Sequence, residues 1–179
     1  MQTIGKQLDH GEGMTNQQMD RPATTGVVPL ELATATPGLA FLEGLRDGAL
    51  PAPPFAAVTD VRLVEAENGR VVFEATPSAR FYNPLGTVHG GWISTLLDSA
   101  MGCAVHSVLR AGQAYTTVDM TISFVRPVIE KTGKLRCEGK IIHAGKRIAT
   151  AEGRVYDAAG TLIAHGSETC LVMSALGAA

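Results

Sequence analysis

The sequence predicts an α+β fold in which a curved antiparallel sheet wraps one long helix. The only long helical pattern, over residues 91–109, is apolar around most of its circumference, as is typical of a helix buried on most sides. After Gly112, four strand-like stretches follow one another with short hairpin-like separators, which indicates an antiparallel meander. With 179 residues, 45% of them hydrophobic, the chain is long enough for one domain with a substantial core.

The N-terminal part divides into a tail and a short helix. Residues 1–35 mix Gln, Gly, Thr, Asn and Pro without periodicity and are expected to form a flexible extension, so the single domain is expected over 36–179. Thr36 suits the N-cap and Pro37 the first turn of a helix over 36–47. That helix is then expected to be stopped by the prolines at 51, 53 and 54.

Six segments carry strand patterns. They are predicted over 58–65, 70–75, 115–125, 134–143, 147–157 and 161–173, with a hairpin turn at Glu67-Asn68-Gly69. The third segment alternates, which predicts two faces: an apolar face of Val118, Met120, Ile122 and Phe124, and a polar face of Thr117, Asp119, Thr121 and Ser123.

Composition and charge narrow the function classes. The net charge is -2 with no basic block, so nucleic acid is not expected as a partner. No apolar run reaches the roughly 18 residues that a membrane-spanning helix needs, and residues 1–20 lack a signal-peptide pattern. Cys103, Cys137 and Cys170 form no CxxC pair, which favours buried structural thiols in a reducing cytoplasm and predicts no metal site.

One acid stands out inside the long apolar helix. Asp98 lies on a stripe of small and polar residues that are three or four positions apart: Gly91, Ser94, Thr95, Asp98 and Gly102. A carboxylate in such a helix is costly to desolvate unless it is paired, hydrogen-bonded or facing a cleft. The stripe therefore allows two interpretations: a cleft-facing group that a ligand approaches, or an acid that hydrogen-bonds a neighbouring strand or subunit.

The helix is preceded by His89-Gly90-Gly91. The first N–H groups of a helix lack intrahelical acceptors, and glycine lets a ligand approach them closely. Such a turn can bind a carbonyl oxygen as it becomes an oxyanion, although an ordinary tight turn would have the same sequence. Asn83 and His89 add further hydrogen-bonding groups nearby.

Taken together, these residues form a longer motif. The pattern Asn-x5-His-Gly-Gly-x6-Asp, at Asn83, His89, Gly90, Gly91 and Asp98, resembles the signature of hotdog-fold acyl-CoA thioesterases. The most similar subgroup is the phenylacetate-pathway (PaaI-like) type, related to 4-hydroxybenzoyl-CoA thioesterases. The segments 116–127 and 165–170 resemble strands of the same family, and the likeness covers about residues 55–174.

The resemblance implies roles for individual residues. Asp98 would be the catalytic carboxylate, either as nucleophile or as general base, and Gly90 would supply the oxyanion N–H from the partner subunit. Asn83 and His89 would position the thioester or water and hold the loop. Thr117 would orient the attacking water; a one-residue slip in alignment would exchange it with Thr116.

The resemblance also implies partners. Two subunits would join their sheets into one, with the site at the interface of a dimer or a dimer of dimers. The substrate would be an acyl-CoA, and no metal or redox cofactor would be needed. Coenzyme A contacts could come from Gly91 and, for the phosphates, from basic side chains: Lys146, Arg147, Arg126 and Arg80.

Two other functions fit the same fold. A non-catalytic module could bind an acyl-CoA or an acyl carrier protein without hydrolysis, but the Asp98 carboxylate argues against a silenced site. A hotdog dehydratase or hydratase would need a His with Asp or Glu in a different arrangement. The sequence does not specify the acyl group, which could be aryl, medium-chain or long-chain.

Overall fold

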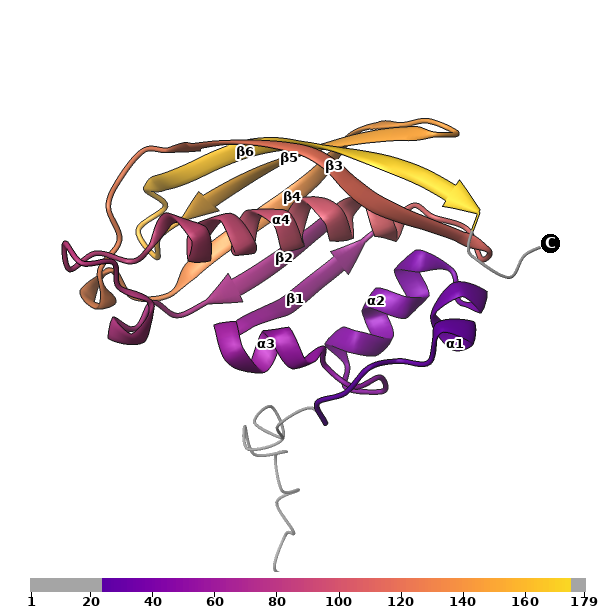
Figure 1. The fold of residues 1–179 in the computed structure, drawn as a ribbon, viewed down its shortest axis with the longest axis horizontal. Coiled ribbons are helices and arrows are strands. Elements are labelled where there is room, and N and C mark those ends of the chain that lie inside the picture. The colour runs from indigo at the N-terminus through magenta and orange to yellow at the C-terminus, as the bar shows by residue number, and fades with distance from the viewer. Residues whose placement is uncertain (1–23, 175–179) are drawn as a thin grey trace, which may run out of the picture.

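The computed structural model describes residues 24–174, in which a curved six-stranded antiparallel sheet wraps a central helix (Figure 1). The α+β prediction is therefore confirmed. The helices are α1 (Leu30–Ala35), α2 (Gly38–Arg46), α3 (Pro54–Thr59) and the central α4 (Gly90–Ser107), with short 3-10 turns η2 (Ala79–Phe81) and η3 (Glu130–Thr132). The strands are β1 (Val61–Glu67), β2 (Arg70–Ala75), β3 (Gln113–Phe124), β4 (Leu135–Ala144), β5 (Ile148–Tyr156) and β6 (Leu162–Ser174).

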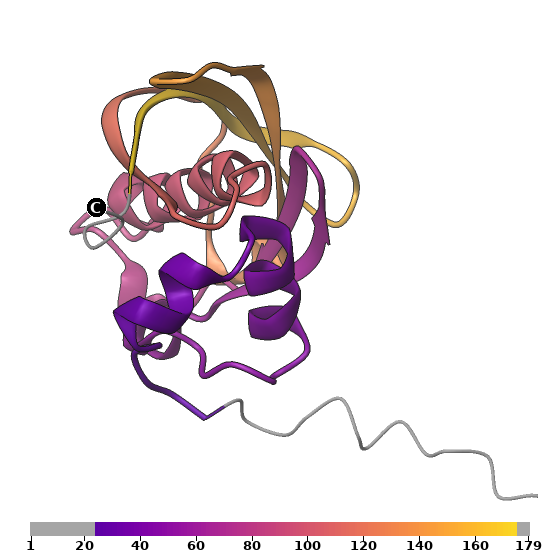
Figure 2. The same cartoon turned by 90° about the vertical axis from the view of Figure 1, so that its right-hand side faces the viewer.

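The sheet has the order β1-β2-β4-β5-β6-β3, and every neighbouring pair is antiparallel. The meander β4-β5-β6 forms its centre, while β3 crosses over to the far side of β6 and becomes an edge. Seen along α4, the sheet curves around the helix, and α1 to α3 lie on the remaining side (Figure 2).

Glycines in the two central strands let α4 lie directly on the sheet. A Cβ at Gly139 of β4 would overlap the carbonyl oxygen of Ala100, and one at Gly153 of β5 would stand 2.9 Å from both Leu97 Cδ2 and Met101 Cγ. Interiors are packed too closely to accept such extra atoms without movement. The absence of side chains at these two positions therefore sets the spacing between helix and sheet.

Opposite these glycines, the core is formed by the apolar side chains of α4. The fully buried ones are Leu96, Leu97, Ala100, Met101, Ala104 and Val105. Trp92 stacks on Phe81 with ring centroids 5.0 Å apart, and its indole N–H donates to the carbonyl of Thr59 at 2.8 Å. The helix is thus held at its first turns as well as along its length.

The N-terminal region differs from the prediction in three places. The N-cap of α2 is Pro37, and Thr36 is instead the C-cap of α1. Helix α1 falls inside the segment expected to be flexible, of which residues 1–23 lie outside the described part of the chain. The prolines after α2 do not merely end a helix: Pro54 occupies the first turn of α3, a position where its missing N–H costs nothing. Val58 is therefore helical, and the first strand begins at Val61 after Asp60 turns into the left-handed region.

The two-face prediction for β3 is wrong at its centre. The pairing with β6 runs Thr117 to Cys170 and then Asp119 to Thr169, so Val118 is an extra residue in a β-bulge. Val118 is 62% exposed instead of facing the core. Directly opposed residues share a face of the sheet. Thr117 is opposite the buried Cys170 and Met120 is opposite the buried Glu168, so Thr117 and Met120 both lie on the concave side.

The described residues include no helix that is both long and apolar enough to cross a membrane. All three cysteines are free thiols; Cys137 and Cys170 are buried and Cys103 is partly exposed. Burial raises the pKa of Cys103 and of Cys170 to about 12, so both are protonated at neutral pH.

Candidate active site

The concave side of the sheet brings the α4 stripe against β3 and β6. Gly102 provides the space, because a Cβ there would stand 2.8 Å from Tyr115 Oη. Asp98 lies one turn before Gly102 on the same helix face. The stripe predicted from the sequence therefore faces the strands that carry Thr117 and Glu168.

Asp98 is accessible to solvent, and no hydrogen bond or ion pair engages its carboxyl within residues 24–174. Its neighbours on the stripe are occupied differently: Ser94 and Thr95 donate back to the carbonyls of Gly90 and Gly91 at 2.9 and 3.0 Å. Desolvation by the surrounding protein raises the pKa of Asp98 above its ordinary value. A carboxylate of this kind is available as a base, because its charge has no partner in the fold.

Glu168 is an acid that the sequence analysis did not single out. It is only 2% exposed, and its Oε1 accepts hydrogen bonds from the Thr117 hydroxyl at 2.7 Å and the Cys170 thiol at 3.1 Å. Burial raises the pKa of Glu168; the two hydrogen bonds oppose the rise, and the charge of Asp98 adds to it. A glutamate that points toward the core from a strand could have indicated a functional residue. The alternating pattern of β6 alone, however, does not show which of its two faces is the concave one.

The loop before α4 is organised by Asn83. Its side-chain oxygen accepts from the backbone N–H groups of Leu85 (2.9 Å) and Thr87 (3.3 Å), and its amide donates to Thr87 Oγ1 at 2.9 Å. The backbone of Gly86 takes a positive φ of 78° within this loop, which favours glycine. The Asn83 side chain is thus engaged in holding the loop.

At the helix start, His89 is the N-cap. Its Nδ1 accepts the Gly91 N–H at 2.9 Å, so this nitrogen is unprotonated and any ring N–H is on Nε2. The Gly90 N–H, by contrast, has no acceptor in the described part of the chain. Gly90 also lines a pocket together with Ile93, Phe124 and Arg126. Of the two glycines, Gly90 is therefore the one with a backbone donor available to a ligand.

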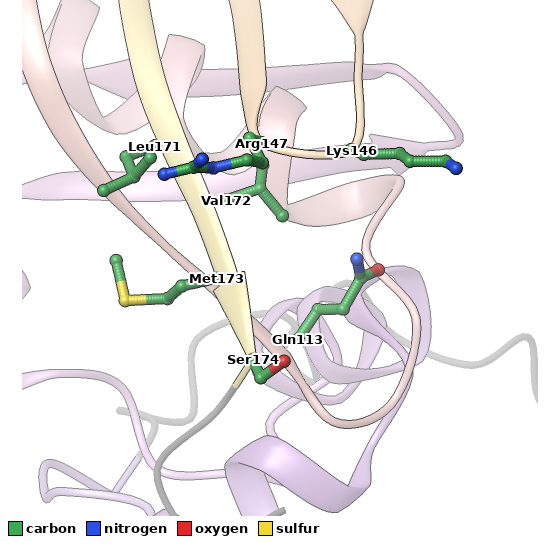
Figure 3. A pocket seen from close by; sticks show the side chains of 7 residues that line it. All are labelled: Gln113, Lys146, Arg147, Leu171, Val172, Met173 and Ser174. Carbon is green, nitrogen blue, oxygen red and sulfur yellow. The ribbon is translucent and has the colours of Figure 1, made fainter.

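The basic residues predicted for phosphate binding occupy different places. Lys146 and Arg147, in the β4–β5 turn, line a groove with Gln113 of β3 and the last residues of β6 (Figure 3). Arg126 donates to the Leu162 carbonyl at 3.0 Å, and Arg80 pairs with Asp60 at 2.5 Å. Only the first two therefore share one groove.

Within one chain, the structure does not bring Gly90 to Asp98. Asp98 lies eight positions after Gly90 in the helix, which corresponds to about 12 Å along the axis at 1.5 Å per residue. Gly90 lies beside Phe124, at the end of β3, whereas Gly102 lies beside Tyr115, near its start. Of the predicted residues, Asp98 lies on the α4 stripe that faces the strand carrying Thr117, whereas Asn83, His89 and Gly90 form a separate group at the start of α4. Among residues 24–174, no cluster of three His, Cys, Asp or Glu could hold a metal ion.

The sequence and the fold of this chain are similar to those of known thioesterases. A family model described as "Thioesterase superfamily" matches residues 85–164. Acyl-coenzyme A thioesterase 13 of Mus musculus is 33% identical over 120 residues, covering 65% of this chain and 84% of the mouse protein. The proofreading thioesterase EntH of Klebsiella pneumoniae is 30% identical over 94 residues, covering 52% of this chain and 67% of that protein. The PaaI structure from the phenylacetic acid degradation operon of E. coli superposes with a TM-score of 0.65 at 20% identity, covering 82% of this chain and 98% of that one.

Proposed function

Because this chain belongs to the thioesterase superfamily, we propose that it hydrolyses an acyl-CoA thioester to a free carboxylic acid and coenzyme A. The observation that carries the proposal is Asp98: a carboxyl on the α4 stripe that faces β3 and β6, with a raised pKa and without a structural partner among the described residues. The free-energy cost of desolvating the Asp98 carboxylate is explained if this group takes part in catalysis.

In the proposed reaction, Asp98 acts on the thioester carbon with a water molecule. As general base it takes one proton from water, the oxygen attacks the carbonyl carbon, and the oxyanion forms. The tetrahedral intermediate then expels the coenzyme A thiolate, which takes the proton back from Asp98. We favour this route over direct attack by Asp98 because Thr117 lies on the concave face that the α4 stripe faces, and its hydroxyl can orient a water there.

The oxyanion needs a donor close to Asp98, and a second copy of the chain can supply it. A donor about 12 Å away along the same helix cannot reach the carbonyl oxygen of a thioester whose carbon is attacked beside Asp98. We propose that the partner's Gly90 provides this N–H, while Asn83 and His89 hold its loop and helix start.

The edge strand β3 offers the surface for that second copy. It is twelve residues long, its outer side has no strand neighbour in the described part of the sheet, and Val118 and Phe124 on it are 62% and 53% exposed. Long apolar edges are normally covered. Antiparallel pairing of two β3 strands across a two-fold axis would carry each helix start toward the other chain's Asp98, and would form at least a homodimer. Lys146 and Arg147 would then bind phosphates of coenzyme A in their groove.

The test is release of free thiol from a panel of phenylacetyl-, benzoyl-, medium-chain and long-chain acyl-CoAs. Wild type should turn over at least one of them, and Asp98→Asn should lower kcat by about 10²- to 10⁴-fold. Asp47→Asn is the matched control, because Asp47 is an exposed acid paired with Arg46 at the end of α2. Tight binding of the panel without turnover would instead identify a binding module, and full activity of Asp98→Asn would remove Asp98 from the chemistry.

A further inference from the structure

Glu168 is buried and yet has one carboxyl oxygen without a partner. Within the described residues, Oε1 accepts two hydrogen bonds while Oε2 has none. A buried, half-satisfied carboxyl is costly, and a fold that needed only packing at this position would be better served by an apolar side chain. A methionine or leucine could accept neither hydrogen bond, and because Cys170 is buried, the contact with Thr117 is the one that can affect a ligand.

That contact determines what the Thr117 hydroxyl can do. Thr117 and Cys170 both donate to Oε1, so this oxygen is a bare acceptor, and a proton on Glu168 would be on Oε2. A hydroxyl has one hydrogen to give. Since Thr117 donates it to Glu168, the hydroxyl can offer only its lone pairs to a group that approaches Asp98.

We propose that Glu168 is a positioning residue that fixes the Thr117 hydroxyl as a hydrogen-bond acceptor for the attacking water; this rests on the proposed hydrolytic function. A water that donates one hydrogen to Asp98 and the other to Thr117 directs a lone pair at the thioester carbon. Without Glu168, the Thr117 hydroxyl is free to rotate and donate to a neighbouring acceptor, Asp98 included. The water then loses one of the two acceptors that orient it.

The experiment compares two replacements of Glu168. Glu168→Gln keeps a carbonyl oxygen that Thr117 and Cys170 can share, whereas Glu168→Met fills a similar volume without an acceptor. Measured as CoA release, Glu168→Gln should keep kcat within about threefold of wild type, and Glu168→Met should lower kcat by about 10- to 100-fold with KM within about threefold. Glu152→Met on the neighbouring β5, where Glu152 pairs with Arg154, is the matched control and should leave both constants unchanged.

A double-mutant cycle with Thr117→Val separates positioning from a general loss of stability. If Glu168 acts through Thr117, adding Glu168→Met to Thr117→Val should lower kcat by less than about threefold further. A purely structural role would lower kcat by a similar factor in both backgrounds and would follow the loss of melting temperature. If Glu168→Met fails to fold, Glu168→Gln still tests the proposal. A decrease in kcat of more than about tenfold in that folded variant would overturn the role of Glu168 as an acceptor for Thr117.

Failure of this inference can be told apart from failure of the proposed function in the same assay. A wild-type protein without turnover on the panel overturns both. An active wild type and an inactive Asp98→Asn, together with an unaffected Glu168→Met or an additive cycle, overturn only the role of Glu168.

Discussion

Gly139 of β4 lies directly beneath the carbonyl oxygen of Ala100 in α4, so close that a Cβ would overlap it. Gly139→Ala must therefore push the helix away from the sheet, which overpacks the core. We expect a loss of about 1–3 kcal/mol in the free energy of unfolding, or failure to fold. Urea unfolding measures this loss. Gly26→Ala is the control, because its Cβ would find only ordinary contacts with Pro51 at 3.4 Å; equal losses in the two variants would contradict the close-packing argument.

The partner-supplied oxyanion donor predicts complementation between two inactive variants. Gly90→Pro removes the N–H at a first-turn position that tolerates proline, and Asp98→Asn removes the carboxylate. Mixed dimers of the two would hold one intact site each. After unfolding and joint refolding, about a quarter of wild-type activity should return, because about half of randomly assembled dimers are mixed.

The control for this experiment is mixing after separate refolding, which should restore nothing until subunits exchange. No recovery from joint refolding, with mixed dimers demonstrated by mass spectrometry of tagged chains, would place both groups in the same chain's site.

The raised pKa of Asp98 predicts that this residue destabilises the fold at neutral pH. Folding raises this pKa, so the folded state binds the proton more tightly than the unfolded chain. Its contribution is fully present below the unfolded-state pKa of about 4 and is lost as the pH rises through the folded-state pKa. Asp98→Asn should therefore melt at a higher temperature than wild type at pH 7, and the gap should shrink toward pH 4. A difference in melting temperature that does not change with pH would instead indicate that the substitution acts through packing.

His106 predicts the opposite dependence. Its ring lies between those of Phe41 and Tyr115, at centroid distances of 5.3 and 5.8 Å, and burial lowers its pKa. A lowered pKa favours the neutral ring in the folded state, so this stability is present above about pH 6.5 and is lost as the pH falls. The melting temperature should drop between pH 7 and pH 5, and His106→Phe should reduce that drop; an equal drop in both proteins would contradict this.

The sequence predicted the parts of the fold that depend on periodicity. The apolar pattern of α4 and the hairpins after Gly112 were found close to their observed bounds, because burial on one side or on all sides leaves a regular trace. The sequence pattern did not predict α3, because a proline such as Pro54 can end one helix or begin another.

The site was predicted by motif more than by geometry. Asp98 and Gly90 were found on one helix, but the twelve-residue edge strand that could unite two chains has no signature of its own. The hydrogen bond between Thr117 and Glu168 was not predicted, because it joins two strands and Thr117 was assigned to the wrong face. Pairwise contacts between strands distant in sequence are not contained in the local pattern of either strand.

The bulge at Val118 means that the position of Thr117 is encoded by a count of residues and not only by their kinds. If the same residues paired with β6 without a bulge, regular alternation would turn either Tyr115 and Thr117 or Met120 and Ile122 to the outer surface. A related chain that lacked the bulge could therefore keep every side chain of the motif and still lose the Thr117 hydroxyl from the concave side.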